Sequence, residues 1–288
     1  MNLLILNYVL PVFLFLFTYY IDAHTDKSSR LFTTVGMASS FTSLFAAFSA
    51  HLAYTSNPTL ALLMMRLCLL CLSFTTISIL RFAVSVPYGT ESKLLTVVNW
   101  LAFFFSGYLV FTGITSVSQS RVLQIGSELA FGVIDTLGLY TLVFIIAVPA
   151  ITILSLLMRV LGMSSRIYRQ RVLFVALSIC IGMVVSWFML RFSFHFLWAF
   201  LCIPFGLAVM LVLLYQAISV TTLFDRTLAL ATMVNFVVLN FIFSVAVAGL
   251  TVLIFANVES VAMKALLLVL TLVVMLFLRE QVAMKMRR

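Results

Sequence analysis

The sequence predicts an all-α, polytopic membrane protein with about nine transmembrane helices. Three observations lead to this prediction: the composition, the spacing of long apolar runs and the distribution of Lys and Arg. Of the 288 residues, 64% are hydrophobic and 9% are charged, and the mean hydropathy is +1.25. Soluble globular domains are about half apolar and about a quarter charged. The composition therefore excludes a soluble globular protein.

Long apolar runs follow one another along the chain, each close to the roughly twenty residues that a helix needs to cross the hydrocarbon core. They cover residues 3–20, 31–54, 60–86, 94–112, 136–160, 172–190, 197–220, 228–255 and 259–278. Most connections are short, so we expect one membrane-embedded helical domain over residues 1–288. Pro11, Pro149 and Pro204 lie inside runs, and we expect kinks there because proline removes a backbone donor.

A basic loop between the fifth and sixth runs orients the chain. Its sequence, RVLGMSSRIYRQR, carries Arg159, Arg166, Arg169 and Arg171. Short loops rich in Lys and Arg stay on the cytoplasmic side, so the N-terminus is predicted outside and the C-terminus inside. Eight further basic residues then lie inside, making twelve: Lys27, Arg30, Lys93, Arg226, Arg279, Lys285, Arg287 and Arg288. Three lie outside: Arg121, Arg191 and Lys264.

The net charge of +9 follows from this orientation and from contact with anionic headgroups. A nucleic-acid partner is therefore not expected. The localisation that we expect is a multi-pass protein of the cell (inner) membrane.

One outer connection, from Gly113 to Asp135, is long enough to form a structure of its own. Polar and apolar residues alternate in it and Gly126 interrupts the pattern, which predicts a small β-hairpin at 113–135 on the outer surface. Loops on a rigid scaffold often carry binding residues. The alternative is a simple lid over the bundle.

Arg66 and Arg81 lie within the third run. Arg81 can reach the inner headgroups with its long side chain. Arg66 lies nearer the outer end, where acidic residues offer pairing partners that would form an outer-facing polar pocket; the alternative is that it reaches the outer headgroups. The outer acids are Glu128, Asp135 and Glu259. The candidate ligand-binding residues are Arg66, Arg121, Glu128 and Asp135.

No pattern in the chain points to catalysis. There is no nucleophile with a base, no Gly-rich phosphate loop and no H-E-x-x-H. Cys68 and Cys71 form a C-x-x-C inside an apolar run, where buried small hydrophobes are the better interpretation than a redox pair. His51 and His195 are isolated. We therefore expect no catalytic residues, no metal and no cofactor.

The last run continues as LFLREQVAMKMRR, without Gly or Pro. Good helix formers throughout predict that the span extends without a break into a cytoplasmic helix to about Arg288. Leu278, Val282 and Met286 would form an apolar stripe, which we predict to be the output contact. Arg279 and the basic residues after it could meet anionic headgroups. The alternative is a plain positive-inside anchor.

Three stretches carry a resemblance to a known family. NPTLALLMMRLCLLCLSFTTISILRFAVSV at the third run, YRQRVLFVALSICIGMVV at the sixth and the long outer loop resemble the N-terminal seven-helix transmembrane sensor module of bacterial histidine kinases and related signalling proteins. The resemblance implies a sensor-like bundle over about 1–220. Two additional spans and the charged exit helix would occupy about 221–288. The family normally continues into a kinase, cyclase or phosphatase, which this sequence lacks after Arg288.

The function expected from these features is a membrane-embedded sensor or signalling module that passes an outer or intramembrane signal to a cytoplasmic partner. The alternatives are a small-solute or lipid transporter and a non-catalytic subunit of a larger membrane complex. No span holds a deep Asp or Glu, which weighs against ion-coupled transport. The expected partners are the lipid bilayer, a cytoplasmic signalling protein and a second copy of the chain.

The predicted orientation can be tested with single cysteines at Ser118 and Ser164 in a background without native cysteines. An impermeant maleimide added to intact cells should label Ser118→Cys and spare Ser164→Cys, because only the first would face outward. Labelling at position 164 alone would invert the orientation.

Overall fold

The computed structural model describes residues 2–21, 27–54, 58–86, 93–113, 138–192, 202–219, 226–257 and 260–286. Helices form nearly all of these residues. In chain order they are α1 (Asn2–Ile21), α2 (Lys27–Tyr54), α3 (Pro58–Ser85), α4 (Lys93–Gly113), α7 (Gly138–Tyr140), η2 (Thr141–Ala147), α8 (Val148–Leu161), α9 (Arg166–Phe192), α10 (Cys202–Ser219), α11 (Arg226–Asn257) and α12 (Val261–Met286).

The all-α prediction is confirmed for these residues, among which no strand occurs. Each apolar run overlaps a helix, the fifth being divided among α7, η2 and α8. Helix α9 begins six residues before its predicted run, and α12 ends eight residues after its run. Within the part of the chain that the structure describes, four stretches are long and apolar enough to cross a membrane: Arg30–Ser49, Thr59–Ser85, Leu142–Leu161 and Tyr168–Ser186. The predicted hairpin at 113–135 lies outside the described residues, apart from Gly113, which ends α4.

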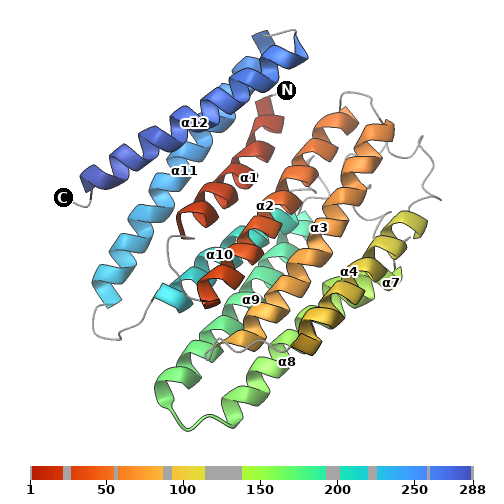
Figure 1. The fold of residues 1–288 in the computed structure, drawn as a ribbon, viewed down its shortest axis with the longest axis vertical. Helices are drawn as coiled ribbons and strands as arrows, with labels where there is room; N and C mark the ends of the chain where they lie inside the picture. Colours follow the sequence, from red (N-terminus) through yellow and green to blue (C-terminus); the bar gives the residue numbers. More distant parts are fainter. Residues whose placement is uncertain are drawn as a thin grey trace.

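Successive helices run in opposite directions along one axis (Figure 1). Helices α2, α4, α9 and α11 begin at the same end of the bundle, where α1, α3, α8, α10 and α12 end. We call this the basic end, because Lys27, Lys93, the arginines of 159–171 and Arg226 are located there in the helices. The segments predicted to face the cytoplasm therefore flank one end of the molecule.

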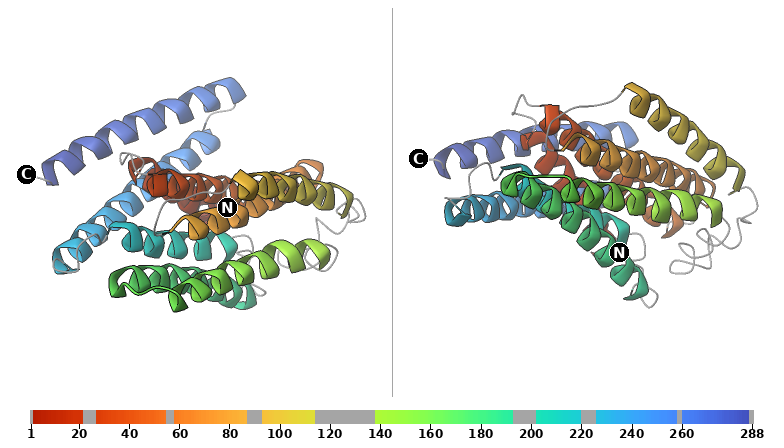
Figure 2. Two further views of the ribbon diagram at one scale, coloured as in Figure 1. Left: turned by 60° about the horizontal axis from the view of Figure 1, so that its bottom comes forward. Right: turned by 90° about the horizontal axis from the view of Figure 1, so that it is seen from below.

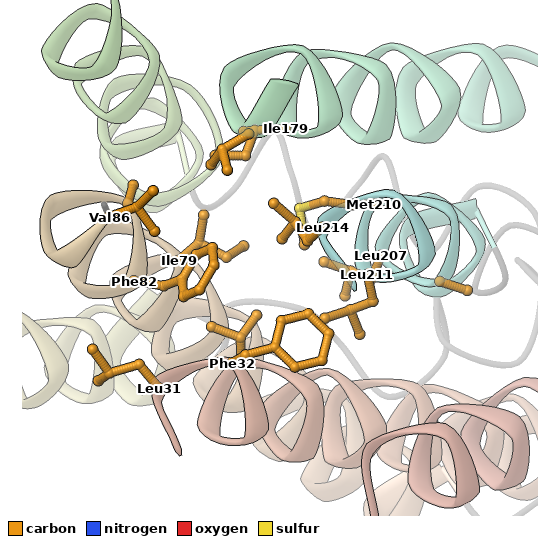
Figure 3. Close-up of a cluster of buried hydrophobic side chains, with 14 of the residues drawn as sticks. Leu31, Phe32, Ile79, Phe82, Val86, Ile179, Leu207, Met210, Leu211 and Leu214 are labelled. Atoms are coloured by element: carbon orange, nitrogen blue, oxygen red, sulfur yellow. The ribbon is translucent and has the colours of Figure 1, made fainter. Parts of the chain in front are cut away.

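Helix α3 has the central position. It packs on α2, α4, α8 and η2, and its neighbours bring α1, α9 and α10 around the same core. Apolar side chains from α2, α3, α9 and α10 converge near the basic end, as Figure 3 shows. There the rings of Phe32 and Phe82 lie 6.2 Å apart. A second cluster around Met65, Tyr140 and Phe144 fills the opposite half of the bundle.

Small residues allow two helix pairs to approach closely, as is common between membrane helices. A methyl group on Gly36 of α2 would overlap the buried Thr18 of α1. A methyl group on Gly206 of α10 would overlap Ser186 and lie 2.6 Å from the Gly182 carbonyl oxygen of α9. The α9–α10 contact is therefore nearly backbone to backbone.

The three prolines behave differently. Pro11 lies inside the continuous helix α1. Before Pro149 the chain winds as a π-helix, in which the Val148 N–H donates to the Val143 carbonyl, so the missing donor of proline is accommodated by a wider turn. Pro204 lies in the first turn of α10, where the lack of an N–H is tolerated, so the predicted mid-span kink is wrong there.

Helices α11 and α12 lie at one side of the bundle (Figure 2). Helix α11 packs on α1, and α12 packs mainly on α11. Much of the surface of α12 consists of exposed large apolar side chains, including Leu266, Val269 and Phe277. Such a surface suits lipid or a partner helix, and it makes α12 the least enclosed of these helices.

Gly206→Ala should destabilise the protein by about 1 to 3 kcal/mol, because the new methyl group meets a backbone carbonyl that cannot move aside alone. Gly249→Ala is the matched control, since nothing lies within 4 Å of its added methyl group. That substitution should be neutral or stabilise by up to about 1 kcal/mol through helix propensity. Thermal unfolding in detergent measures both, and equal shifts would refute the close contact.

Candidate functional site

Hydroxyl groups connect α3 to its neighbours. Thr75 Oγ1 lies 3.2 Å from Thr42 Oγ1 of α2, and Ser73 Oγ lies 2.7 Å from Ser106 Oγ of α4. Toward the opposite end, Ser49 Oγ of α2 donates to the Ala61 carbonyl at 3.0 Å. Hydrogen bonds of this kind between membrane helices contribute about 0.6 kcal/mol each, and up to about 1.7.

A tyrosine holds the π-helical region against α3. Tyr140 is buried, with 1% of its surface exposed, and its hydroxyl donates to the Leu69 carbonyl at 2.5 Å. Its ring lies 5.2 Å from that of Phe144, inside the second apolar cluster. A buried tyrosine normally needs such a partner for its hydroxyl. The start of the η2–α8 segment is therefore fixed to the middle of α3.

Arg159 fixes the other end of the same pair of helices. It lies in the last turn of α8, and its Nη1 donates to the Val84 carbonyl at 2.5 Å and to the Val86 carbonyl at 3.1 Å. The last carbonyls of a helix have no partner within that helix, and a cation there also complements the helix dipole. Arg159, which belongs to the basic loop that predicts the orientation of the chain, therefore also caps α3.

Arg66 lies on α3 toward the opposite end and is half-buried. Its Cζ lies 5.6 Å from the ring centroid of Phe111 at the end of α4, within cation–π range. Its Nε is buried and has no hydrogen-bond partner among the described residues. The predicted neighbours Arg121, Glu128 and Asp135 lie outside the described residues, so an acidic partner for Arg66 stays a prediction.

An apolar groove lies between α2, α3 and α4. Its volume is about 530 Å³, within the range of small-ligand sites. Helices α2 and α4 both pack on α3 but scarcely on each other, so α3 forms the floor of the groove. The lining side chains are Thr33, Thr34, Met37, Ala38, Phe41, Leu70, Cys71, Phe74, Trp100 and Phe103. Nothing in the sequence marks this groove, because it depends on how three helices pack.

Cys68 and Cys71 do not belong to a metal-ligand set among the described residues. Cys68 is buried and Cys71 is half-buried, and both are free thiols. Within the described ranges, no group of three or more His, Cys, Asp or Glu side chains could hold a metal ion.

The exit helix is continuous, as predicted: α12 runs through Arg279 to Met286. Leu278 and Val282, two members of the predicted output stripe, are 45% and 38% exposed. The side chain of Met286 lies outside the described residues. Arg279 is 2% exposed, so the expectation that it reaches the headgroups is wrong, and it lies within the protein instead.

No family model, curated protein or solved structure matches this chain.

Arg159→Met should lower the free energy of unfolding by about 2 to 3 kcal/mol, because two charge-assisted hydrogen bonds to helix-end carbonyls disappear. Arg159→Lys should restore part of the loss, since it keeps the charge but lacks the fork of donors. Arg166→Met, at an exposed position in the same loop, is the control and should change little. Unfolding in detergent measures all three. Equal losses from Arg159→Met and Arg166→Met would show that the cap does not stabilise α3.

Proposed function

We propose that this chain is a membrane-embedded sensor or signalling module, which passes an outer or intramembrane signal to a cytoplasmic partner at the basic end. The observation that supports this proposal most is the unbroken helix α12, in which Leu278 and Val282 are exposed on either side of the buried Arg279. The nine membrane passages and the orientation with the C-terminus inside are part of the same proposal.

The length of α12 supports transmission across a bilayer. Its 26 residues span about 39 Å at 1.5 Å per residue, whereas the hydrocarbon core is about 30 Å thick. A single rigid helix of this length reaches beyond the hydrocarbon. Because α12 packs mainly on α11, it can shift or rotate without disrupting the core around α3.

The buried side chain of Arg279 favours one position of α12 relative to the rest of the protein, from which the helix could shift or rotate. It is the only side chain of α12 that is buried among those described, and it follows an apolar run on the same helix. Withdrawing a buried arginine from its surroundings is costly, so α12 has a preferred register against the rest of the protein. A signal would act by changing that preference.

A lipid transporter is the second candidate, and the groove between α2, α3 and α4 favours it. A transporter should also show polar groups that converge near the middle of the membrane. The buried hydroxyls near the middle of α2 and α3 instead bond to each other or to helix carbonyls, as Thr42 does with Thr75 and Ser39 with the Val35 carbonyl, and they do not line the groove. The sensor proposal therefore has the stronger support.

The double variant Val282→Ser with Met286→Ser should lose its cytoplasmic partner. Removing two apolar side chains that the partner would bury weakens binding by on the order of a hundredfold. Leu270→Ser with Val274→Ser is the matched control, since these residues have the same spacing on α12 and are 56% and 46% exposed. Cross-linking in cells followed by mass spectrometry compares both variants with the parent.

A kinase, phosphatase or response regulator that is captured by the parent and the control, but not by the Val282 and Met286 variant, supports signalling. Membrane fractionation must show that all three forms insert equally. If the two double variants retain the same cytoplasmic proteins, this end of α12 is an anchor and the signalling proposal fails.

A further inference from the structure

We propose that the groove between α2, α3 and α4 holds one acyl chain of an anionic phospholipid, whose headgroup lies at the basic end. This inference does not rest on the sensor role, because a sensor, a transporter or a subunit could each hold such a lipid. It assigns an occupant by chemistry to the apolar groove between these three helices.

The dimensions of the groove suit a lipid chain. On α2 the lining runs from Thr33 to Phe41, which is about 12 Å along the helix at 1.5 Å per residue. One leaflet of the hydrocarbon core is about 15 Å deep. The groove therefore follows the helix axis over most of the depth of one leaflet.

The walls offer apolar contact along this length. On one side Phe41 is 49% exposed, and on the other Trp100 is 53% exposed. Between them the Phe103 ring lies 5.6 Å from Phe74 and 6.1 Å from Trp100 in edge-on geometry, which makes a continuous aromatic wall. The hydroxyl of Thr34 donates to the Arg30 carbonyl, so this polar group at the rim is satisfied without a ligand.

The exposed positive charge next to the groove lies at its basic end, whereas Arg66, one turn before Leu70 toward the opposite end, is half-buried and lies over the Phe111 ring. Arg30 is exposed and lies three and four residues before Thr33 and Thr34, on the same face of α2. On α3, Arg81 lies two turns beyond Phe74, toward the same end.

This arrangement selects among apolar occupants. A partner helix without acidic residues, or a lipid with no net charge, would gain less from the basic residues than an anionic headgroup does. An anionic phospholipid places its chain in the groove and its phosphate beside Arg30, with each basic residue contributing about 1 kcal/mol of attraction. Charge and shape therefore identify the same ligand class.

Fluorescence of Trp100 tests the proposal. With Trp187→Phe and Trp198→Phe, Trp100 is the only tryptophan left in the full chain. The protein is reconstituted in phosphatidylcholine vesicles that contain equal fractions of brominated phosphatidylglycerol or brominated phosphatidylcholine. Brominated phosphatidylglycerol should quench Trp100 more strongly. Arg30→Gln should weaken this preference about fivefold, the factor that corresponds to 1 kcal/mol.

Two further variants separate the groove from general surface charge. Arg169→Gln removes an exposed arginine at the same end, on α9, and should leave the preference intact. Cys71→Phe fills the groove and should abolish the preference, with Thr34→Phe as a second filling variant if the first does not fold. Equal quenching by both lipids, or equal effects of Arg30→Gln and Arg169→Gln, would overturn the proposal.

Discussion

The bundle depends on the hydrogen bonds that α3 makes across helix interfaces. In hydrocarbon, apolar contact with another helix replaces equally apolar contact with lipid, so close packing and polar contacts decide which helices associate. Helix α3 has polar contacts on three sides, through Thr75 to α2, through Ser73 to α4 and through the Leu69 carbonyl to Tyr140. These contacts determine where its neighbours lie.

The other features follow from that arrangement. Because α2 and α4 flank α3 without packing on each other, a groove remains between them with α3 as its floor. Arg159 of α8 caps α3 and so links these two helices at the basic end. Arginine therefore both stabilises this end and, through the positive-inside preference, orients the chain. Helix α12 takes no part in this network of α3 contacts, and it is the element best placed to move.

The helices could be predicted from the sequence because each apolar run is long and bounded by polar segments. The predicted turn at RFSFHF lies mostly outside the described residues, and its first two residues, Arg191 and Phe192, end α9. The π-helix before Pro149 could not be predicted, since it depends on how the chain resolves the missing donor locally. The importance of the basic end was visible from its charges, but the role of Arg159 as a cap was not.

The candidate site was predictable only in part. Arg66 was recognised because a charge inside an apolar run is unusual, yet its contact with Phe111 requires the packing of α3 on α4. The stripe of Leu278 and Val282 follows from helical spacing, whereas the burial of Arg279 between such exposed neighbours does not. Contacts between side chains that are far apart in the chain are hard to predict from a single sequence.

The most direct test of the central role of α3 compares two matched pairs of hydroxyl deletions. Thr42→Val with Ser73→Ala removes bonds between helices, while Thr152→Val with Ser178→Ala removes equally buried hydroxyls that bond to carbonyls of their own helices. Unfolding free energies measured in bicelles should fall further for the first pair, by on the order of 1 kcal/mol. Equal losses for both pairs would show that the hydroxyl contacts of α3 do not hold the bundle together.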